Sequence, residues 1–260
     1  MIYDWDIPEN NAVNYLKVCK SFVEDNLLFK DFRRNELYHE ILEHVSYDDA
    51  KSYIEEMKNI SHLTGDDIFD LKKNDEVGNP VTFEFEKFGD ISPTTIRYIK
   101  NVLDISDFLD GEKVDNIVEI GGGYGGLCRI IHSYIGFENY MILDLPEVNE
   151  LSKKYLSNFQ SLDEKVMQMF YDEISSVDNI DLLISNYAFS ECSFELQEAY
   201  YNGVISNANK FYITYNNITP RNMSSEYFLE YASKDFDIEV ENEVRKCHTN
   251  FIMYGTKKNK

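Results

Sequence analysis

A glycine-rich loop is the first place in the sequence where residue types and spacing indicate chemistry. The stretch "IVEIGGGYGGL" (117–127) is a short apolar run that meets five glycines within six positions. Glycine lets a backbone turn sharply and approach a ligand closely. In open α/β sheets, ligands bind at the carboxyl ends of the strands. The loop therefore predicts a site for a ligand that contains a nucleoside.

Two nucleotide-binding patterns fit this loop. Gly121, Gly123 and Gly126 match the dinucleotide fingerprint. Glu119, Gly121, Gly123 and Gly125 match the S-adenosylmethionine pattern of methyltransferases. An acidic group beside the loop suits the cationic amino group of S-adenosylmethionine, whereas dinucleotide folds usually have an apolar residue there. The long segment before the loop also favours the methyltransferase pattern, because dinucleotide domains often begin with the loop.

Asp144 is the second residue whose position indicates nucleoside binding. It ends the next apolar run, 19 positions after Gly125. A carboxylate at this point can accept hydrogen bonds from both ribose hydroxyls, and it would repel a 2′-phosphate, so NADP is disfavoured. The alternative is a helix N-cap ahead of Pro146.

The charge balance favours a small-molecule ligand. The chain of 260 residues has 47 acidic and 25 basic residues and a net charge of -22. Nucleic-acid binding depends on Lys and Arg, and a surface this negative repels polyanions and anionic membranes. We therefore expect no nucleic-acid or membrane partner. Four widely spaced cysteines without zinc spacing and an N-terminus without signal-peptide features predict a cytoplasmic protein with free thiols.

The elements that must position these residues alternate along the second part of the chain. Apolar runs separated by helical stretches predict a parallel sheet covered on both faces. Two final runs are joined by too few residues for a crossover, so they must form an antiparallel hairpin. The runs are 114–120, 139–144, 165–171, 180–186, 210–216, 237–244 and 250–257.

The first part of the chain has a different pattern. Residues 10–70 repeat the apolar spacing of amphipathic helices. Ser92 and Pro93 predict the start of another helix, which runs to about Leu103. We interpret 1–75 as a helical cap over the acceptor site or a homodimer contact, and 76–260 as the ligand-binding domain.

Several segments together resemble the sugar O-methyltransferase family, class I enzymes that use S-adenosylmethionine and are associated with surface polysaccharide clusters. The segments are "IVEIGGGYGGLCRII", "YMILDLPEV", "DLLISNYAFSEC", "VGNP" and "ISPTTIRYIKNVLDI", and they cover roughly 77–217. The resemblance implies a Rossmann-like seven-stranded sheet whose last strand is antiparallel. It implies methyl transfer to a hydroxyl of a sugar or a sugar-linked precursor. Three alternatives stay open: a phosphoryl-linked or other small polar acceptor, an NAD-dependent oxidoreductase, and a non-catalytic relative.

The resemblance also implies that Glu119, Gly121, Gly123 and Asp144 hold the cofactor, and other residues near the same edge are expected to join them. Arg97 is expected to pair with the methionine carboxylate, because a guanidinium group suits a bidentate contact, although a surface ion pair is an equal alternative. Tyr124, the one large side chain within the loop, is expected to cover the cofactor or face the acceptor. The residues expected at the cofactor are Arg97, Glu119, Gly121, Gly123, Tyr124, Gly125, Asp144, Leu145, Asn186 and Tyr187.

Two residues are candidates for removing the acceptor proton. A sugar hydroxyl is a weak acid, so a general base should contribute roughly 10²–10⁴-fold. His248 lies between the last two strands, which places it at the ligand edge, and Glu191 follows the fourth strand at that edge. Glu191 could take the proton or orient His248. A solvated turn histidine and a helix N-terminal acid are the structural alternatives. We expect no metal ligands.

Overall fold

The computed structural model describes residues 9–160, 162, 164–170, 177–217, 223–243 and 250–259. Its α-helices are α1 (Glu9–Glu24), α2 (Asn26–Lys30), α3 (Glu36–Ile41), α4 (Tyr47–Glu56), α5 (Gly65–Lys72), α6 (Pro93–Leu109), α7 (Gly126–Tyr134), α8 (Pro146–Leu156), α9 (Ala188–Glu191), α10 (Phe194–Gly203) and α11 (Ser225–Ala232). Its strands are β1 (Phe83–Phe85), β2 (Gly89–Ile91), β3 (Asn116–Ile120), β4 (Asn139–Asp144), β5 (Val166–Phe170), β6 (Ile180–Asn186), β7 (Ala208–Tyr215), β8 (Phe236–Asn242) and β9 (Phe251–Lys257). None of the helices described is long and apolar enough to cross a membrane.

Seven strands form one sheet in the order β5-β4-β3-β6-β7-β9-β8. The pairs among β5, β4, β3, β6 and β7 are parallel, whereas β9 is antiparallel to both β7 and β8. The predicted fold class and the predicted terminal hairpin are therefore confirmed. The apolar runs predicted the strands because a parallel sheet covered on both faces leaves little room for polar side chains.

The direction in which the chain winds reverses between β3 and β6. β4 lies on one side of β3 and β6 lies on the other. Such a topological switch point opens a crevice at the carboxyl ends of the two strands. Those ends are Ile120, which precedes the glycine loop, and Asn186, while β4 ends beside them at Asp144.

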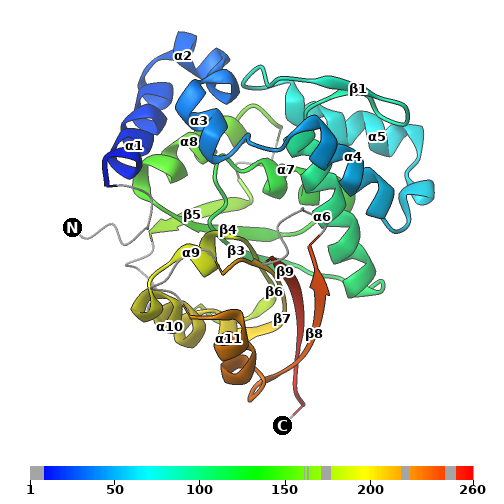
Figure 1. Cartoon of the computed structure of the whole chain (residues 1–260), viewed down its shortest axis with the longest axis vertical. Coiled ribbons are helices and arrows are strands. Elements are labelled where there is room, and N and C mark those ends of the chain that lie inside the picture. Colours follow the sequence, from blue (N-terminus) through cyan, green and yellow to red (C-terminus); the bar gives the residue numbers. More distant parts are fainter. Residues whose placement is uncertain are drawn as a thin grey trace.

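Helices cover both faces of the sheet (Figure 1). α10 and α11 lie on one side, and α6, α7 and α8 lie on the other. Outside this second layer, α1 packs on α8, α4 packs on α6 and α5 packs on α7. One hydrophobic cluster runs from Tyr15 and Phe22 of α1 to Tyr140 and Ile142 of β4. The N-terminal helices therefore share a core with the sheet.

The predicted start of α6 is confirmed. The Ser92 side chain accepts a hydrogen bond from the Thr95 amide, and Pro93 occupies the first turn. The helix continues past the predicted end to Leu109, because Ile105 and Leu109 extend its buried face. It ends where Asp110 adopts a left-handed conformation.

Arg33 fastens the N-terminal helices to α6. Its side chain is 0% exposed, and it donates to both carboxylate oxygens of Glu43 at 2.7 and 3.1 Å. It also donates to Asp75 Oδ1 at 2.9 Å, to the Asn74 carbonyl at 3.1 Å and to Ser92 Oγ at 3.1 Å. A buried guanidinium satisfied at every nitrogen fixes the elements that supply its partners.

Candidate active site

The glycine loop joins β3 to α7 at the switch point. Gly121, Gly123 and Gly125 all have positive φ, at 77°, 55° and 88°. A Cβ atom on Gly121 would lie 2.0 Å from the Cβ of Ala188 in α9. A larger residue therefore fits neither the backbone conformation nor the space at this position. The loop must keep this path to bring its backbone to the edge of the sheet.

Asp144 holds the loop in place. Its carboxylate accepts hydrogen bonds from the Gly123 amide at 3.0 Å and from the Leu145 amide at 2.7 Å. Burial raises the pKa of Asp144 from 3.8 to about 6, and the two backbone amides oppose that rise. Leu145, not Asp144, is the N-cap residue of α8, with Pro146 at the first helical position. A carboxylate offers about four lone-pair sites, so two bonds leave acceptor capacity for a ligand.

Glu119 lies beneath the loop, and its side chain points to Tyr140. It is 2% exposed, and its Oε2 accepts a hydrogen bond from the Tyr140 hydroxyl at 2.8 Å. Burial raises the pKa of Glu119 from 4.5 to about 7, the Tyr140 bond lowers it, and the Asp144 charge raises it further. Glu119 and Asp144 thus form an acidic pair on adjacent strands next to the loop.

The position of Tyr124 differs from the expectation that it covers the cofactor or faces the acceptor. Its side chain is 0% exposed and packs against the rings of Phe32, Tyr98 and Tyr155. The Arg33 guanidinium lies 5.0 Å from its ring centroid. This packing argues against a side chain that covers the cofactor or faces the acceptor, because the ring is enclosed by the N-terminal helices and α8. Tyr124 instead anchors the loop from behind.

Arg97 is a buried cation near the same edge. It is 6% exposed, and its Nε has no hydrogen-bond partner among the residues that the structure describes. Its Cζ lies 5.5 Å from the ring centroid of Tyr98 and 5.9 Å from that of Tyr187. Desolvation lowers the pKa of Arg97, but the surrounding tyrosines and Glu243 outweigh that effect and raise it above its ordinary value. The alternative of a surface ion pair does not fit this burial.

Asn186 and Tyr187 lie where β6 ends. Asn186 Oδ1 accepts hydrogen bonds from Asn101 Nδ2 at 3.0 Å and Thr214 Oγ1 at 2.9 Å. Asn186 Nδ2 is buried and has no partner within the described part of the chain. Tyr187 has a φ of 67°, which is uncommon for a residue other than glycine. An unpaired buried donor and a strained backbone are both features that cluster at ligand sites.

Glu191 ends the short helix α9 beside β7. Its Oε1 accepts a hydrogen bond from Asn216 Nδ2 at 2.9 Å. Burial raises the pKa of Glu191, and the Asn216 bond lowers it. The predicted position at the ligand edge agrees with the structure, since α9 follows β6 directly. His248, the other predicted catalytic residue, lies outside the described residues.

Glu243 and Tyr53 are polar residues at this edge that sequence reasoning missed. Glu243 directly follows β8, is 8% exposed and accepts hydrogen bonds from the hydroxyls of Tyr53 and Tyr187. An acidic residue at the carboxyl end of β8, which runs in the same direction as β7, was a usable signal for Glu243. No sequence signal indicated Tyr53, because it belongs to α4, which is far from β6 and β8 along the chain. Among the described residues, no group of three or more His, Cys, Asp or Glu residues could hold a metal ion.

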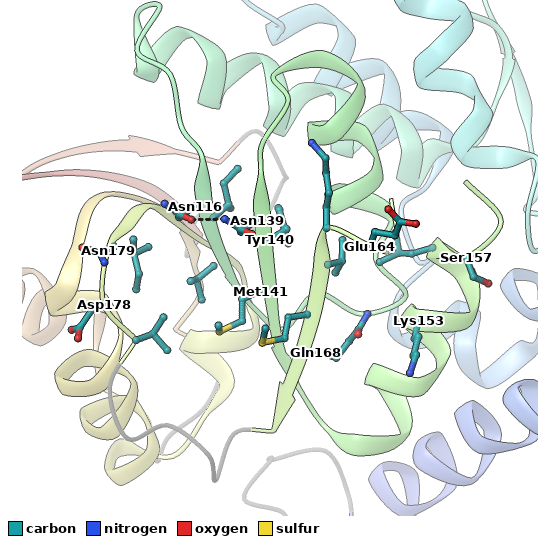
Figure 2. Close-up of a pocket in the computed structure, with 18 residues that line it drawn as sticks. Asn116, Asn139, Tyr140, Met141, Lys153, Ser157, Glu164, Gln168, Asp178 and Asn179 are labelled. Carbon is teal, nitrogen blue, oxygen red and sulfur yellow. Dashed lines mark hydrogen bonds between the residues drawn. The ribbon is translucent and has the colours of Figure 1, made fainter. Parts of the chain in front are cut away.

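A groove of about 730 Å³ lies elsewhere in the molecule (Figure 2). Asn116, Asn139, Met141 and Gln168 line it, together with Lys153 of α8. These strand residues lie near the amino ends of β3, β4 and β5. The groove lacks all of the predicted site residues that the structure describes. The chemistry identifies the carboxyl edge as the candidate site.

The sheet, with the candidate site at its carboxyl edge, has the architecture of a class I methyltransferase. Two similar solved structures are those of magnesium protoporphyrin IX methyltransferase (ChlM) from Synechocystis PCC 6803, with bound S-adenosylhomocysteine and with bound S-adenosylmethionine. Both are 12% identical to this chain with a TM-score of 0.50. Both alignments cover 63% of this chain, and they cover 87% and 83% of those chains. At this identity the likeness concerns the fold.

The family follows from the sequence. Residues 47–201, more than half of the chain, match the O-methyltransferase domain family, and the chain belongs to that family. A search of curated proteins found no match. The protein is thus an S-adenosylmethionine-dependent O-methyltransferase, which decides the choice of cofactor that the glycine loop left open.

Proposed function

We propose that this O-methyltransferase methylates a hydroxyl of a sugar or a sugar-linked precursor in surface polysaccharide biosynthesis. The observation that carries the proposal is the polar lining at the ends of β6, β7 and β8. Asn186, Glu191, Asn216 and Glu243 gather there with buried or half-buried side chains. A hydroxyl-rich acceptor needs many donors and acceptors, whereas an aromatic acceptor needs apolar walls. The sequence segments that resemble sugar O-methyltransferases support the same acceptor class.

The residues around the glycine loop fit the proposed cofactor contacts. Asp144 retains acceptor capacity for ribose hydroxyls, and Asn186 Nδ2 is a buried donor without a partner among the described residues. Within the same residues Arg97 Nε is also unpaired, and Arg97 provides the positive charge that a methionine carboxylate requires. Bound S-adenosylmethionine supplies an electrophilic methyl group. The backbone of Gly121 and Gly123 lies where the loop can approach a nucleoside, and Leu145 lies beside Asp144.

Glu191 is the proposed group that accepts the proton of the acceptor hydroxyl, directly or by orienting His248. Its raised pKa brings it closer to neutral pH, which suits a general base. Asn216 holds one carboxylate oxygen, Oε1, through Nδ2, and the other oxygen is the one proposed to take the proton. The N-terminal helices contribute Tyr53 to this side of the site, in keeping with a cap over the acceptor.

A panel of acceptors tests the proposed substrate class. Purified protein and S-adenosylmethionine are incubated with free hexoses, nucleotide-linked hexoses, glycerol phosphate and catechol, and S-adenosylhomocysteine formation is measured. We expect turnover with a hexose or a nucleotide-linked hexose that exceeds the turnover with the other compounds by at least about tenfold. A preference for catechol or glycerol phosphate would contradict the sugar proposal.

Substitution of Glu191 tests the proposed proton acceptor. With the best acceptor of the panel, we expect Glu191→Gln to lower kcat by at least about tenfold, because the amide cannot take a proton. Affinity for S-adenosylhomocysteine, measured by calorimetry, should stay within about twofold of the parent protein. Glu195→Gln, at an acidic residue on the next helix, is the matched control. Full activity of Glu191→Gln would remove Glu191 from the mechanism.

A further inference from the structure

A buried carboxylate at the end of β8 joins three parts of the fold. Glu243 Oε1 accepts hydrogen bonds from the hydroxyls of Tyr53, at 2.8 Å, and Tyr187. Its Oε2 accepts one from Asn250 Nδ2 at 2.8 Å. Tyr53 belongs to α4, Tyr187 follows β6 and Asn250 precedes β9. A buried charge is tolerated only when it is paired or hydrogen-bonded, so these bonds determine where the carboxylate lies.

Tyr187 is held in a strained conformation. Its φ of 67° lies in a region that side chains other than glycine rarely adopt. The Tyr187 amide donates to the Thr214 carbonyl at 2.9 Å, and its carbonyl accepts from the Glu191 amide at 3.1 Å. The hydroxyl donates to Glu243. Backbone strain persists where the surroundings fix a residue from several sides, and it is concentrated at functional sites.

The Tyr187 ring is one of two rings beside the Arg97 guanidinium. The ring centroids of Tyr187 and Tyr98 lie 5.9 and 5.5 Å from Arg97 Cζ. Within the part of the chain that the structure describes, Arg97 forms no ion pair with a carboxylate. Among the described residues, the rings of Tyr98 and Tyr187 pack beside the guanidinium and can therefore hold its orientation.

We infer that Glu243 is a positioning residue for the cofactor, because it fixes Tyr187 and thereby orients Arg97 toward the methionine carboxylate. The inference rests on the proposed contact between Arg97 and that carboxylate. Glu243 does not contact the cofactor in this account, although it belongs to the polar lining proposed for the acceptor. It acts through the Tyr187 hydroxyl, and it also ties α4 to the same point through Tyr53.

Two ligands that differ only at the methionine end test the inference. S-adenosylhomocysteine has an amino acid group, and 5′-methylthioadenosine lacks it but retains the adenosine and the thioether. We expect Glu243→Gln and Tyr187→Phe each to weaken S-adenosylhomocysteine about tenfold by calorimetry. Affinity for 5′-methylthioadenosine should change by less than about twofold. The double variant should be no weaker than the single variants, because both remove the same link.

Glu241→Gln is the matched control. Glu241 lies in β8 two residues before Glu243 and also contacts the N-terminal helices, through Lys58 at 2.8 Å. Its side chain is 45% exposed and lies outside the Tyr187 contacts, so this variant should bind both ligands normally. Equal weakening of both ligands in Glu243→Gln would overturn the inference, since it would indicate a general structural role.

Arg97→Met separates this inference from the proposed cofactor contact. If Arg97→Met selectively weakens the binding of S-adenosylhomocysteine and Glu243→Gln does not, the contact of Arg97 with the carboxylate is supported and the positioning role of Glu243 is rejected. If Arg97→Met binds S-adenosylhomocysteine as tightly as the parent protein, both the Arg97 contact and the positioning role of Glu243 are rejected. Far-UV circular dichroism and thermal unfolding establish that each variant is folded before binding is compared.

Discussion

Glu119 and Asp144 are two buried carboxylates on adjacent strands beside the glycine loop. Each has a pKa raised by burial, to about 7 for Glu119 and to about 6 for Asp144. Without a cationic partner, ionising both groups is unfavourable in the folded protein. A cofactor with a cationic amino group would relieve that cost. The two side chains therefore couple the pH dependence of stability to the proposed ligand site.

Glu119→Gln should alter that pH dependence. Because its pKa is higher in the folded state than the ordinary 4.5, the Glu119 contribution to stability is fully present below about pH 4.5 and is lost as pH rises through about 7. The loss amounts to about 3 kcal/mol for a shift of this size. Glu119→Gln retains an acceptor for Tyr140 but does not titrate, so its unfolding free energy should fall less over this window.

Urea unfolding without cofactor at several pH values between about 4 and 8 measures the difference. Glu150→Gln, at an exposed residue of α8, should follow the parent protein. If the unfolding free energy of the parent protein and of Glu119→Gln changed equally with pH, the pKa of Glu119 in the folded protein would be its ordinary value, which would contradict the prediction.

At the scale of elements, the strands were more predictable than the helices that surround them. The observed bounds of β4 and β6 equal the predicted runs 139–144 and 180–186, because an apolar run bounded by turn residues identifies a buried parallel strand. The strand ends then placed Asn186 and Glu191 at the ligand edge. Tyr124 could not be placed in this way, because its contacts with Phe32 and Arg33 come from a distant part of the chain.

The contacts of Arg33 predict how strongly the N-terminal helices depend on that tertiary packing. We expect Arg33→Met to reduce the free energy of unfolding by about 3–5 kcal/mol, because it leaves Glu43 and Asp75 without their cation. Arg34→Met is the control, since the neighbouring Arg34 bonds to the carbonyls of Asn79 and Pro80 near the surface and should cost less than about 1 kcal/mol. Equal losses measured by urea unfolding would contradict the role of the buried network.

At the scale of the molecule, the N-terminal helices and the sheet share one hydrophobic core. The hydrophobic cluster is continuous across position 75, and the family match begins at residue 47, at the start of α4. The proposed boundary between 1–75 and 76–260 thus marks a change in sequence pattern within a shared core. Periodicity along the chain reveals helices but not the layer against which they pack, which is why this arrangement was not predictable.

The central claim is that the cofactor binds at the carboxyl edge of the sheet. A crystal structure of the protein with S-adenosylhomocysteine tests it most directly. We predict that the ligand lies against the glycine loop, with its ribose at Asp144 and its amino acid carboxylate at Arg97. A ligand in the groove at the amino ends of β3, β4 and β5 (Figure 2), or one that contacts neither Asp144 nor Arg97, would contradict the account.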